Sequence, residues 1–353
     1  MKTIRRPSYT ATTPRVTVVV PCYNYGHYLP RAIDSALDQE GVRSDVVVVD
    51  DCSTDGSLRV ALELAAKDER IRVISQNPNR GHIQTYNHGL SEATGDYVVL
   101  LSADDMLAPG SLLRSTSLME AHPSVGLVYG YAPAFRDVPQ LSSMSRESWS
   151  VWKGIEWMTH MSRRGHNIIV NPEAILRKSI MDQLVGYRED MPQAADMELW
   201  LRAASICDVG RVNGPEQAFY RLHTNNMHRT SMDGVIREAQ ARRDVFLSLL
   251  QNQELPPETR KVLVRRATEK MSRDLVHEAR KVHGRHSTEP QKLVDELLDL
   301  AVKCDPSIAR SVSWRILNLR RRRNMPKVVT YLEDVLHRAV WSLRWRRWRR
   351  WGI

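Results

Sequence analysis

The stretch Tyr97-Val98-Val99-Leu100-Leu101-Ser102-Ala103-Asp104-Asp105-Met106 determines how the rest of the chain is interpreted. An apolar run that ends in two adjacent carboxylates is typical of a buried central strand that carries negative charge to the carboxyl edge of a sheet, where open α/β folds bind ligands. Hard divalent cations take one or two carboxylates together with phosphate oxygens. The Asp104-Asp105 pair therefore predicts a metal–diphosphate site, or else a solvated acidic turn, because Asp is common where strands turn back.

Strands and helices alternate on both sides of this stretch, as apolar β-branched runs and amphipathic patterns indicate. The predicted strands are 16–20, 46–49, 71–75 and 125–131, and the predicted helices are 28–38, 57–67, 81–93 and 109–119. Such alternation predicts parallel strands joined by right-handed crossovers. A dinucleotide-binding fold would need G-x-G-x-x-G after the first strand. Residues 21–26 read PCYNYG instead, which disfavours a nicotinamide dehydrogenase.

Polar residues follow three of the predicted strands: Tyr23 after the first, Asp50-Asp51 after the second and Asp104-Asp105 after the central one. The carboxyl ends of parallel strands meet at one edge of a sheet, so we expect these side chains to line one crevice. One tyrosine, carboxylates and a pair suited to a cation would together hold a base, a ribose and a diphosphate.

Four motifs occur in the order and at the intervals of a known family: VVVPCYN at 18–24, VVDDCSTDGS at 48–57, NRG at 79–81 followed by Asn87 and Gly89, and GDY at 95–97 leading to Asp104-Asp105. In this order they closely resemble the nucleotide-sugar half of family 2 glycosyltransferases of the GT-A fold. The resemblance implies an α/β fold, GT-A-type and Rossmann-like, with a mostly parallel sheet flanked by helices.

The resemblance also implies roles for residues in the nucleotide-sugar half, 15–131. Pro21 and Tyr23 would line the nucleotide pocket, Asp51 would read the base, Gly81 and Asn87 would add contacts to the nucleotide sugar, Asp104 would face the ribose and diphosphate, and Asp105 would ligate Mn²⁺ or Mg²⁺.

The acceptor half, 132–230, contains ADMELWLR at 195–202, which resembles the family's E-D-x-x-L-x-x-R helix. Asp196 falls on the position of the catalytic base. From the residues alone, the helix dipole, which favours an acid in the first turn, explains Asp196 better than catalysis does. The YRLH segment at 220–223 also resembles the family, and it makes His223 a candidate for the metal or the diphosphate; the alternative is a hydrogen-bonded structural histidine.

Two departures from the family pattern concern these sites. The metal strand reads LSADD at 101–105 where the family often has L-D-x-D-D, so the first carboxylate is missing. The Glu that precedes the base in the family is Ala195 here. Without that neighbouring charge, the pKa of Asp196 can be lower.

The C-terminal third changes character. Helices are predicted at 235–251, 257–282, 290–302 and 306–320, within a helical extension at 231–325. The formal net charge of the chain is +10, and residues 310–353 alone carry +11, which leaves −1 for the remainder.

A basic Trp-rich tail, 326–353, ends the chain. At 100° per residue its Trp341, Trp345, Trp348 and Trp351 fall within an arc of about 120°. A Trp face flanked by arginines favours a helix lying on an anionic membrane surface. A solvated or self-docked tail is the first alternative. Nucleic acid is a less favoured one.

The cysteines and the apolar residues of the sequence indicate where the protein is located in the cell. Cys22, Cys52, Cys207 and Cys304 form no C-x-x-C motif and fit a reducing compartment. The N-terminal segment 1–14 is polar, and no run of about 18 apolar residues occurs. We therefore expect a cytoplasmic protein, peripheral on the inner face of the cell membrane.

Together these observations predict a metal-dependent, inverting glycosyltransferase. It would move a sugar from a nucleoside-diphosphate donor, with a UDP-sugar expected first, to a hydroxyl of a lipid-linked or cell-surface glycan precursor. A nucleotidyltransferase is one alternative, but it would need a basic, glycine-rich phosphate loop, and residues 21–26 contain no Lys or Arg. A scaffold that binds nucleotide sugar or membrane without turnover is the other.

Overall fold

The computed structural model describes residues 2–4, 13–141, 147–223, 232–283, 290–323 and 342–343. These residues pack as two compact units, and the boundary between them falls inside one helix, α5 (Gly154–Arg164). Unit 1 comprises the described residues up to 157 and 168–223, and unit 2 comprises 158–167 and the described residues from 232 onward.

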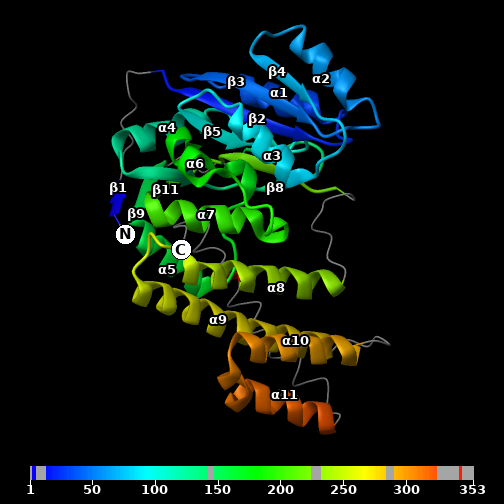
Figure 1. The fold of residues 1–353 in the computed structure, drawn as a ribbon, viewed down its shortest axis with the longest axis vertical. Helices are drawn as coiled ribbons and strands as arrows, with labels where there is room; N and C mark the ends of the chain where they lie inside the picture. The colour runs from blue at the N-terminus through cyan, green and yellow to red at the C-terminus, as the bar shows by residue number, and fades with distance from the viewer. Residues whose placement is uncertain are drawn as a thin grey trace. The chain divides into compact units, whose positions relative to one another are not determined.

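Unit 1 is an α/β unit (Figure 1). Its strands are β1 (Lys2–Ile4), β2 (Arg15–Cys22), β3 (Arg43–Asp50), β4 (Ile71–Ser75), β5 (Tyr97–Leu100), β6 (Met106–Leu107), β7 (Val125–Tyr129), β8 (Ala134–Phe135), β9 (Ser148–Trp152), β10 (Ile175–Arg177), β11 (Asp208–Asn213) and β12 (Ala218–Arg221). Its helices, besides the start of α5, are α1 (Leu29–Leu37), α2 (Ser57–Ala65), α3 (His82–Ser91), α4 (Ser111–Ala121), α6 (Lys178–Leu184) and α7 (Ala195–Ile206), with 3₁₀ turns η1 (Asn171–Glu173) and η2 (Pro192–Ala194).

The described strands form a nine-stranded sheet in the order β1-β9-β11-β7-β10-β5-β2-β3-β4 and a three-stranded sheet, β6-β12-β8. Strands β5, β2, β3 and β4 are mutually parallel, and β11 is parallel to β7. Strand β10 runs antiparallel between β5 and β7. The predicted class, an α/β fold with a mostly parallel sheet, is therefore confirmed.

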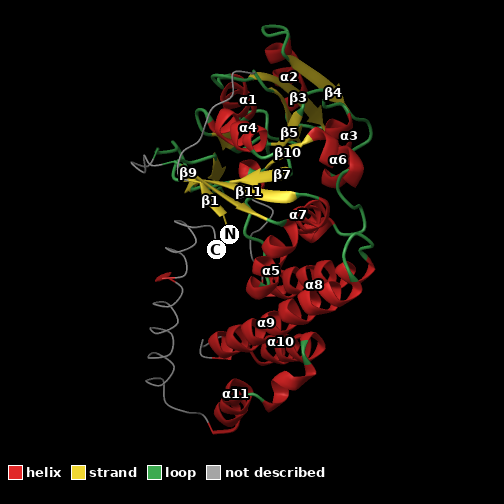
Figure 2. Ribbon diagram, turned by 90° about the vertical axis from the view of Figure 1, so that its left-hand side faces the viewer, coloured by secondary structure: helices red, strands yellow, loops and turns green. Residues whose placement is uncertain are grey.

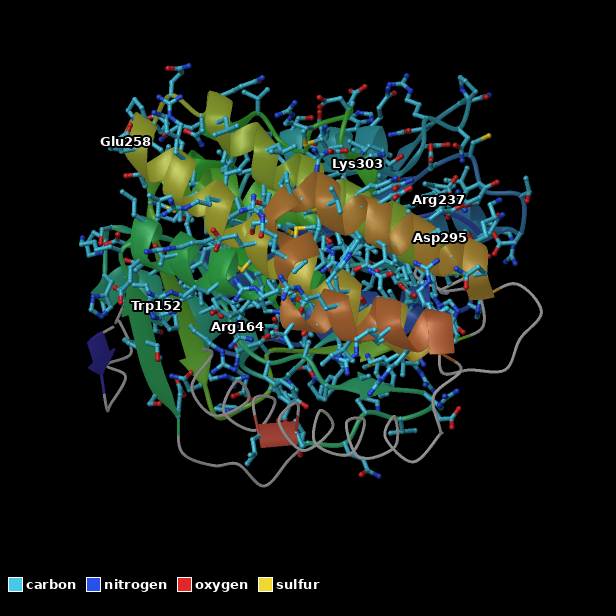
Figure 3. The ribbon with its side chains drawn as sticks, turned by 90° about the horizontal axis from the view of Figure 1, so that it is seen from below. Trp152, Arg164, Arg237, Glu258, Asp295 and Lys303 are labelled. Atoms are coloured by element: carbon cyan, nitrogen blue, oxygen red, sulfur yellow. The ribbon has the colours of Figure 1, made fainter. Side chains whose placement is uncertain are left out.

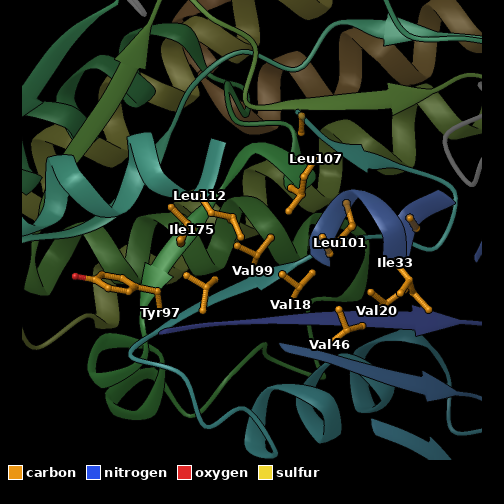
Figure 4. Close-up of a cluster of buried hydrophobic side chains, with 14 of the residues drawn as sticks. Val18, Val20, Ile33, Val46, Tyr97, Val99, Leu101, Leu107, Leu112 and Ile175 are labelled. Carbon is orange, nitrogen blue, oxygen red and sulfur yellow. The ribbon is translucent and has the colours of Figure 1, made fainter. Parts of the chain in front are cut away.

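Strands β2, β3 and β5 are buried on both faces over most of their length, which explains their continuous valine-rich runs. Val18 and Val20 of β2 pack with Ile33 of α1 and Leu112 of α4 on one face (Figure 4). Helices α1 and α4 lie on one side of the sheet, and α3 and α6 lie on the other (Figure 2). Burying each such valine contributes roughly 1.5–3 kcal/mol.

The edge strand β1 was not predicted. Residues 2–4, which the sequence analysis assigned to a polar N-terminal segment, pair antiparallel with β9. Three residues carry too little pattern to predict a strand, and only the exposed edge of the sheet makes their pairing favourable.

Unit 2 is helical in its described part (Figures 2 and 3). It contains α8 (Met232–Ser248), η3 (Leu249–Gln251), α9 (Pro257–His283), α10 (Pro290–Cys304), η4 (Pro306–Arg310) and α11 (Val312–Arg323). The four predicted helices are confirmed, except that η4 and Ser311 break the last one. Asp305 caps η4, because its Oδ1 accepts a hydrogen bond from the Ser307 N–H at 2.9 Å.

Helix α9 packs its apolar face against α10, and Ser272 Oγ donates a 2.7 Å hydrogen bond to the Ala301 carbonyl in this interface. The predicted boundary at 230 stays a prediction, and residues 158–167, which it placed in the acceptor half, pack with unit 2.

The predicted Trp face at 326–353 lies outside the described residues, except for Ser342 and Leu343, which are helical and exposed. Among the helices that the structure describes, none combines the length and the apolar character that crossing a bilayer requires.

Candidate active site

Three strand ends meet at the carboxyl edge of the sheet, as predicted. Strand β2 ends at Cys22 and β3 at Asp50, and the Asp51 N–H donates to the Cys22 carbonyl at 2.9 Å. The Leu101 N–H, just after β5, donates to the Val19 carbonyl at 2.9 Å. This register directs the turns after β2, β3 and β5 to one edge of the sheet.

The turns after β2 and β3 are joined by side-chain hydrogen bonds. The Asn24 N–H donates to Ser53 Oγ at 3.0 Å, and Asn24 Oδ1 accepts from the Thr54 N–H at 2.8 Å. Asn24 and Cys52 both adopt positive φ, at 59° and 62°. Between these turns Pro21 is half-buried in β2, whereas Tyr23 is 48% exposed and its ring is accessible to a ligand.

Asp51 organises the loop that precedes α3. Its side chain is buried, and Oδ1 accepts from the Arg80 N–H at 2.7 Å while Oδ2 accepts from the Gly81 N–H at 3.0 Å. Gly81 has φ of 81°, a left-handed conformation that glycine adopts without strain. The two predicted nucleotide contacts are thus in direct contact. Each carboxylate oxygen has a second lone pair, so base reading by Asp51 stays a prediction.

Asp104 and Asp105 are both buried, in the turn that follows β5. Burial, and next the negative charge of Asp104, raise the pKa of Asp105 well above its usual range. The Arg221 N–H opposes this shift by donating to Asp105 Oδ1 at 2.8 Å. Two neighbouring buried carboxylates form a site that would gain from a cation.

The three-stranded sheet brings His223 to this pair. In it β12 pairs antiparallel with β6, directly after Asp105, and parallel with β8. His223 Nε2 lies 2.8 Å from Asp104 Oδ2. The imidazole packs against Tyr25 and Tyr28, each with its ring centroid 5.5 Å away. The structure therefore brings together Asp104, Asp105 and His223, which the sequence analysis selected separately.

Sequence reasoning missed Arg221, which is buried at the centre of this arrangement. Its guanidinium lies 4.7 Å from the Tyr28 ring centroid and 4.4 Å from that of Phe135. Its Nε donates to the Asp104 carbonyl at 2.7 Å. Arg221 stands in the YRLH segment that we used for the family resemblance, but nothing in the segment indicates that an arginine on a strand would be buried between two aromatic rings.

A divalent cation fits the chemistry of these donors. Mn²⁺ and Mg²⁺ take carboxylate oxygens, imidazole is also a ligand for transition metals, and Mg²⁺ sites commonly use one or two carboxylates plus substrate phosphates. Among the described residues, no group of three or more His, Cys, Asp or Glu is placed to hold a metal ion. Metal binding by Asp105 and His223 therefore stays a prediction.

Asp196 lies half-buried in the first turn of α7, and its charge adds to the effect of burial in raising the pKa of Tyr187 above its usual range. Burial raises the pKa of Tyr86 well above its usual range, and the charges of Asp196, Asp104 and Asp105 add to the shift. One tyrosine is therefore within electrostatic reach of all three carboxylates, although they come from two distant parts of the sequence.

Asn87 uses both polar atoms of its amide on the backbone of one residue. Oδ1 accepts from the Tyr187 N–H at 2.7 Å, and Nδ2 donates to the Tyr187 carbonyl at 2.8 Å. The predicted contact of Asn87 with the nucleotide sugar stays a prediction.

The arginine of the α7 motif has a structural role that the sequence analysis did not assign. Arg202 donates to both oxygens of Glu198, at 2.7 and 2.8 Å, and also to the carbonyls of Leu184 at 2.6 Å and Gly186 at 2.8 Å. Glu198 is buried, so this pairing compensates its charge. Ala195, where the family has Glu, is a buried apolar residue.

Comparison with known proteins agrees with this geometry. A family profile described as "Glycosyl transferase family 2" matches residues 17–184. The succinoglycan biosynthesis protein ExoO of Rhizobium meliloti is 44% identical over 108 residues, which are 31% of this chain and 30% of that relative. The match thus spans less than a third of the length of that curated relative.

Two solved structures share the fold. The crystal structure of S. aureus TarS 1-349 in complex with UDP-GlcNAc has a TM-score of 0.64 at 17% identity, over 88% of this chain and 92% of that one. The mannosyltransferase PcManGT from Pyrobaculum calidifontis, in complex with GDP-Man and Mn²⁺, has a TM-score of 0.56 at 20% identity, over 96% of this chain and 84% of that one. The expected GT-A-type fold is confirmed.

Proposed function

Because residues 17–184 of this chain belong to glycosyl transferase family 2, we propose that it transfers a sugar from a nucleoside-diphosphate donor to an acceptor hydroxyl. The observation that carries the proposal is the buried Asp104-Asp105 pair at the carboxyl edge of the sheet, with His223 Nε2 2.8 Å from Asp104 Oδ2. Such a pair can bind the cation that stabilises a departing diphosphate, and Asp196 in the first turn of α7 is the proposed general base.

The reaction would invert the anomeric carbon. Asp196 takes the proton of the acceptor hydroxyl while that oxygen bonds to the anomeric carbon. The bond from that carbon to the diphosphate breaks on the opposite face. Asp105 and His223 would hold Mn²⁺ or Mg²⁺, and Asp104 would face the ribose and diphosphate. The bound cation would supply the positive charge that stabilises the departing diphosphate.

The donor nucleotide is proposed as UDP first. The exposed Tyr23 ring offers a surface on which a base can stack, and Asp51, whose N–H donates to the Cys22 carbonyl, has carboxylate lone pairs that can accept from a ring N–H. The TarS neighbour is in complex with UDP-GlcNAc, but the PcManGT neighbour is in complex with GDP-Man, so GDP is the alternative to compare.

The acceptor is proposed to be a lipid-linked or cell-surface glycan precursor reached from an anionic membrane surface on the inner face of the cell membrane. In addition to the composition of the tail, the exposed side of α11 supports this idea. Val312 is 72% exposed, Leu319 is 48% exposed and Ile316 is half-buried between them. At i, i+4 and i+7 these residues share one side of the helix, and the exposed Arg315 flanks it. An apolar stripe with flanking arginines suits an anionic lipid interface.

Calorimetric titration of UDP, GDP and dTDP, with and without Mn²⁺, tests the nucleotide site. We expect Mn²⁺-dependent binding of one nucleotide, and loss of that binding in Asp105→Ala. Asp96→Asn is the matched control, because Asp96 is an exposed carboxylate paired with Arg15 at the amino end of β5. Absence of binding by all three nucleotides would contradict the proposal.

The two alternatives predict different results in an assay of product release from nucleotide sugars and from nucleoside triphosphates. A non-catalytic scaffold would bind nucleotide but release no nucleoside diphosphate from any donor sugar. A nucleotidyltransferase would prefer a nucleoside triphosphate and release pyrophosphate from it. Release of nucleoside diphosphate from a nucleotide sugar supports the transferase.

A further inference from the structure

Arg221 is a buried cationic residue at the site, and the proposed reaction assigns it no role. It lies on β12, the central strand of the three-stranded sheet, where Phe219 pairs with Met106 of β6 and Arg221 itself pairs with Phe135 of β8. Its side chain is buried. A buried guanidinium is unfavourable unless hydrogen bonds and nearby charges compensate it, so its contacts should indicate what it does.

Both the backbone and the side chain of Arg221 bind the turn that contains Asp104 and Asp105. The Arg221 N–H donates to Asp105 Oδ1 at 2.8 Å, and Arg221 Nε donates to the Asp104 carbonyl at 2.7 Å. Two residues further along the chain, His223 Nε2 lies 2.8 Å from Asp104 Oδ2. Among the described residues the second oxygen of each carboxylate, Asp104 Oδ1 and Asp105 Oδ2, accepts no hydrogen bond. These two oxygens are the ones that a cation would meet.

The guanidinium of Arg221 is itself restrained. Its carbon lies 4.7 Å from the Tyr28 ring centroid and 4.4 Å from that of Phe135, which are distances typical of cation–π contacts. Its Nη1 donates to the Arg136 carbonyl at 3.1 Å. A planar group that contacts two rings and donates to carbonyls from both Nε and Nη1 has little freedom to rotate. Lysine has neither the plane nor the second donor edge that these contacts use.

We propose that Arg221 is a positioning residue for the Asp104-Asp105 pair: its guanidinium fixes the peptide between the two residues, so that their second oxygens face one cation together. Tyr28 and Phe135 hold the guanidinium in its plane. This inference rests on the proposed function, because it concerns the pair that is proposed to bind the cation.

The physical reason lies in the peptide bond that joins Asp104 to Asp105. The Asp104 carbonyl belongs to this rigid plane, so a hydrogen bond to it restricts the backbone torsions on both sides and with them the directions of both side chains. Cations such as Mg²⁺ demand near-ideal ligand geometry. A hydrogen bond from a charged donor corresponds to a factor of about ten or more in an equilibrium constant, so we expect its loss to weaken binding about tenfold.

Calorimetric titration of the full chain with UDP or GDP, with and without Mn²⁺, tests the inference. We expect Arg221→Lys, which keeps the charge but not the planar group, to weaken nucleotide binding about tenfold in the presence of Mn²⁺ and to leave binding without Mn²⁺ unchanged. A general structural defect would weaken both. Wild-type affinity of Arg221→Lys in the presence of Mn²⁺, or an equal loss with and without Mn²⁺, would overturn the assignment.

Arg177→Lys is the matched control. Arg177 also lies over an aromatic ring, that of Tyr97 at 5.4 Å, and donates to the carbonyls of Val125 and Met119. It pairs with Tyr97 at the amino end of β5, opposite to the Asp104-Asp105 turn, so its replacement should not change nucleotide binding under either condition. Loss of Mn²⁺-dependent binding in this control as well would mean that any stacked arginine of unit 1 has the same effect, and would overturn the specific role of Arg221.

A double-mutant cycle tests whether the aromatic contact acts through Arg221. Phe135→Leu keeps an apolar side chain in the cluster with Ala108 and Phe219 but removes the ring beside the guanidinium. We expect it to weaken Mn²⁺-dependent nucleotide binding about threefold in the wild-type background and to have no further effect together with Arg221→Lys. Equal losses in the two backgrounds would mean that Phe135 acts independently, and would overturn its assigned role.

A readout that needs neither nucleotide nor metal separates this inference from the proposed function. In a crystal structure of Arg221→Lys we expect the Asp104 carbonyl and the Asp105 carboxylate in new orientations, and an unchanged turn overturns the proposal. A wild-type chain that binds no nucleotide with Mn²⁺ contradicts the proposed function, whereas the crystal structure still decides whether Arg221 orients the pair.

Discussion

At the scale of single residues, Asp105 and Asp196 have different surroundings that match different tasks. Asp105 is buried beside a second carboxylate, and its pKa is raised by burial and by the charge of Asp104. These surroundings are those expected of a carboxylate that binds a cation. Asp196 is half-buried in the first turn of α7, where the helix dipole favours a negative charge. An ionised carboxylate is the form that can accept a proton.

Asp196→Asn should therefore lower sugar transfer by about 10²–10⁴-fold, which is the usual contribution of general base catalysis. The substitution keeps the shape of the side chain, so the affinity for UDP or GDP should not change. Steady-state release of nucleoside diphosphate, together with calorimetric titration, measures both quantities. Asp190→Asn is the control, since Asp190 is exposed and pairs with Arg188. Near wild-type transfer by Asp196→Asn would place the base at another residue.

Glu173 gives unit 1 a dependence of stability on pH. It is buried, its Oε1 accepts from the Val170 N–H at 3.0 Å, and its Oε2 has no hydrogen-bond partner. Burial raises the pKa of Glu173 to about 8. The folded chain thus keeps the proton that the unfolded chain loses above its ordinary pKa of 4.5. The contribution of Glu173 to stability is then greatest below pH 4.5 and falls as pH rises to about 8, by at most about 1.4 kcal/mol per pH unit.

Glu173→Gln should flatten this pH dependence, because the amide is neutral at every pH and its oxygen can still accept from Val170. Thermal unfolding at pH 5 and pH 8 measures the effect. We expect the midpoint of the variant to exceed that of the wild type at pH 8 by more than at pH 5. Glu189→Gln, an exposed substitution, is the control. If the unfolding midpoints of wild type and Glu173→Gln changed equally between pH 5 and pH 8, ionisation of Glu173 would not affect the stability of the fold.

At the scale of elements, α3 illustrates how packing against the sheet positions the site. It approaches β2 and β3 closely at Gly89, where an added Cβ would lie 2.3 Å from Val19 Cγ1 and 2.9 Å from Val49 Cγ2. This approach brings Asn87 to Tyr187 and Gly81 to Asp51. Gly89 thus allows the close packing of α3 on the sheet. This packing positions the two predicted nucleotide contacts, Gly81 just before the helix and Asn87 within it.

Gly89→Ala should destabilise the fold. Alanine improves helix propensity by about 1 kcal/mol, but overpacking a close contact typically costs about 1–3 kcal/mol, and the clash with two valines of the sheet favours the upper end. We expect a net loss of about 1–2 kcal/mol in urea unfolding. Ser91→Ala on the same helix is exposed and should change stability by less than about 0.5 kcal/mol. Equal or greater stability of Gly89→Ala would mean that α3 shifts away from the sheet without loss.

At the scale of the whole molecule, the net charge is distributed unevenly along the chain. The residues before 310 have a net charge of −1, whereas residues 310–353 carry +11. Each basic residue near an anionic lipid surface contributes about 1 kcal/mol, so we expect the C-terminal region to hold the chain at a membrane under the proposed function.

Flotation with phosphatidylglycerol-containing vesicles tests whether the C-terminal region binds an anionic membrane. We expect the full chain to float with anionic vesicles and not with phosphatidylcholine alone, and deletion of 326–353 to abolish flotation. Val312→Ser with Leu319→Ser should weaken it, whereas Leu62→Ser, an exposed leucine of α2, should not. Flotation that survives the deletion would end the membrane role of the tail. Displacement of the chain from vesicles by duplex DNA would favour the nucleic-acid alternative.

Local patterns in the sequence were sufficient for most of the fold and for the identity of the main carboxylates. Buried parallel strands require continuous apolar runs, and their ends must turn at one edge, so runs such as 46–49 and 97–101 followed by Asp pairs already predict where a ligand binds. The resemblance of the motifs to those of family 2 glycosyltransferases then selected Asp51, Asp104, Asp105 and Asp196 as candidate site residues. Periodicity likewise predicted the helices of the C-terminal third.

Only the tertiary structure decided which of these residues act together. The contacts of Arg221 with Asp105 and of Asn87 with Tyr187 join residues that are far apart in the chain, and no local pattern encodes them. The same is true of the antiparallel insertion of β10 and of the edge strand β1. Apolar periodicity records which face of an element is buried, whereas the partner that a buried polar group meets depends on how all the elements pack.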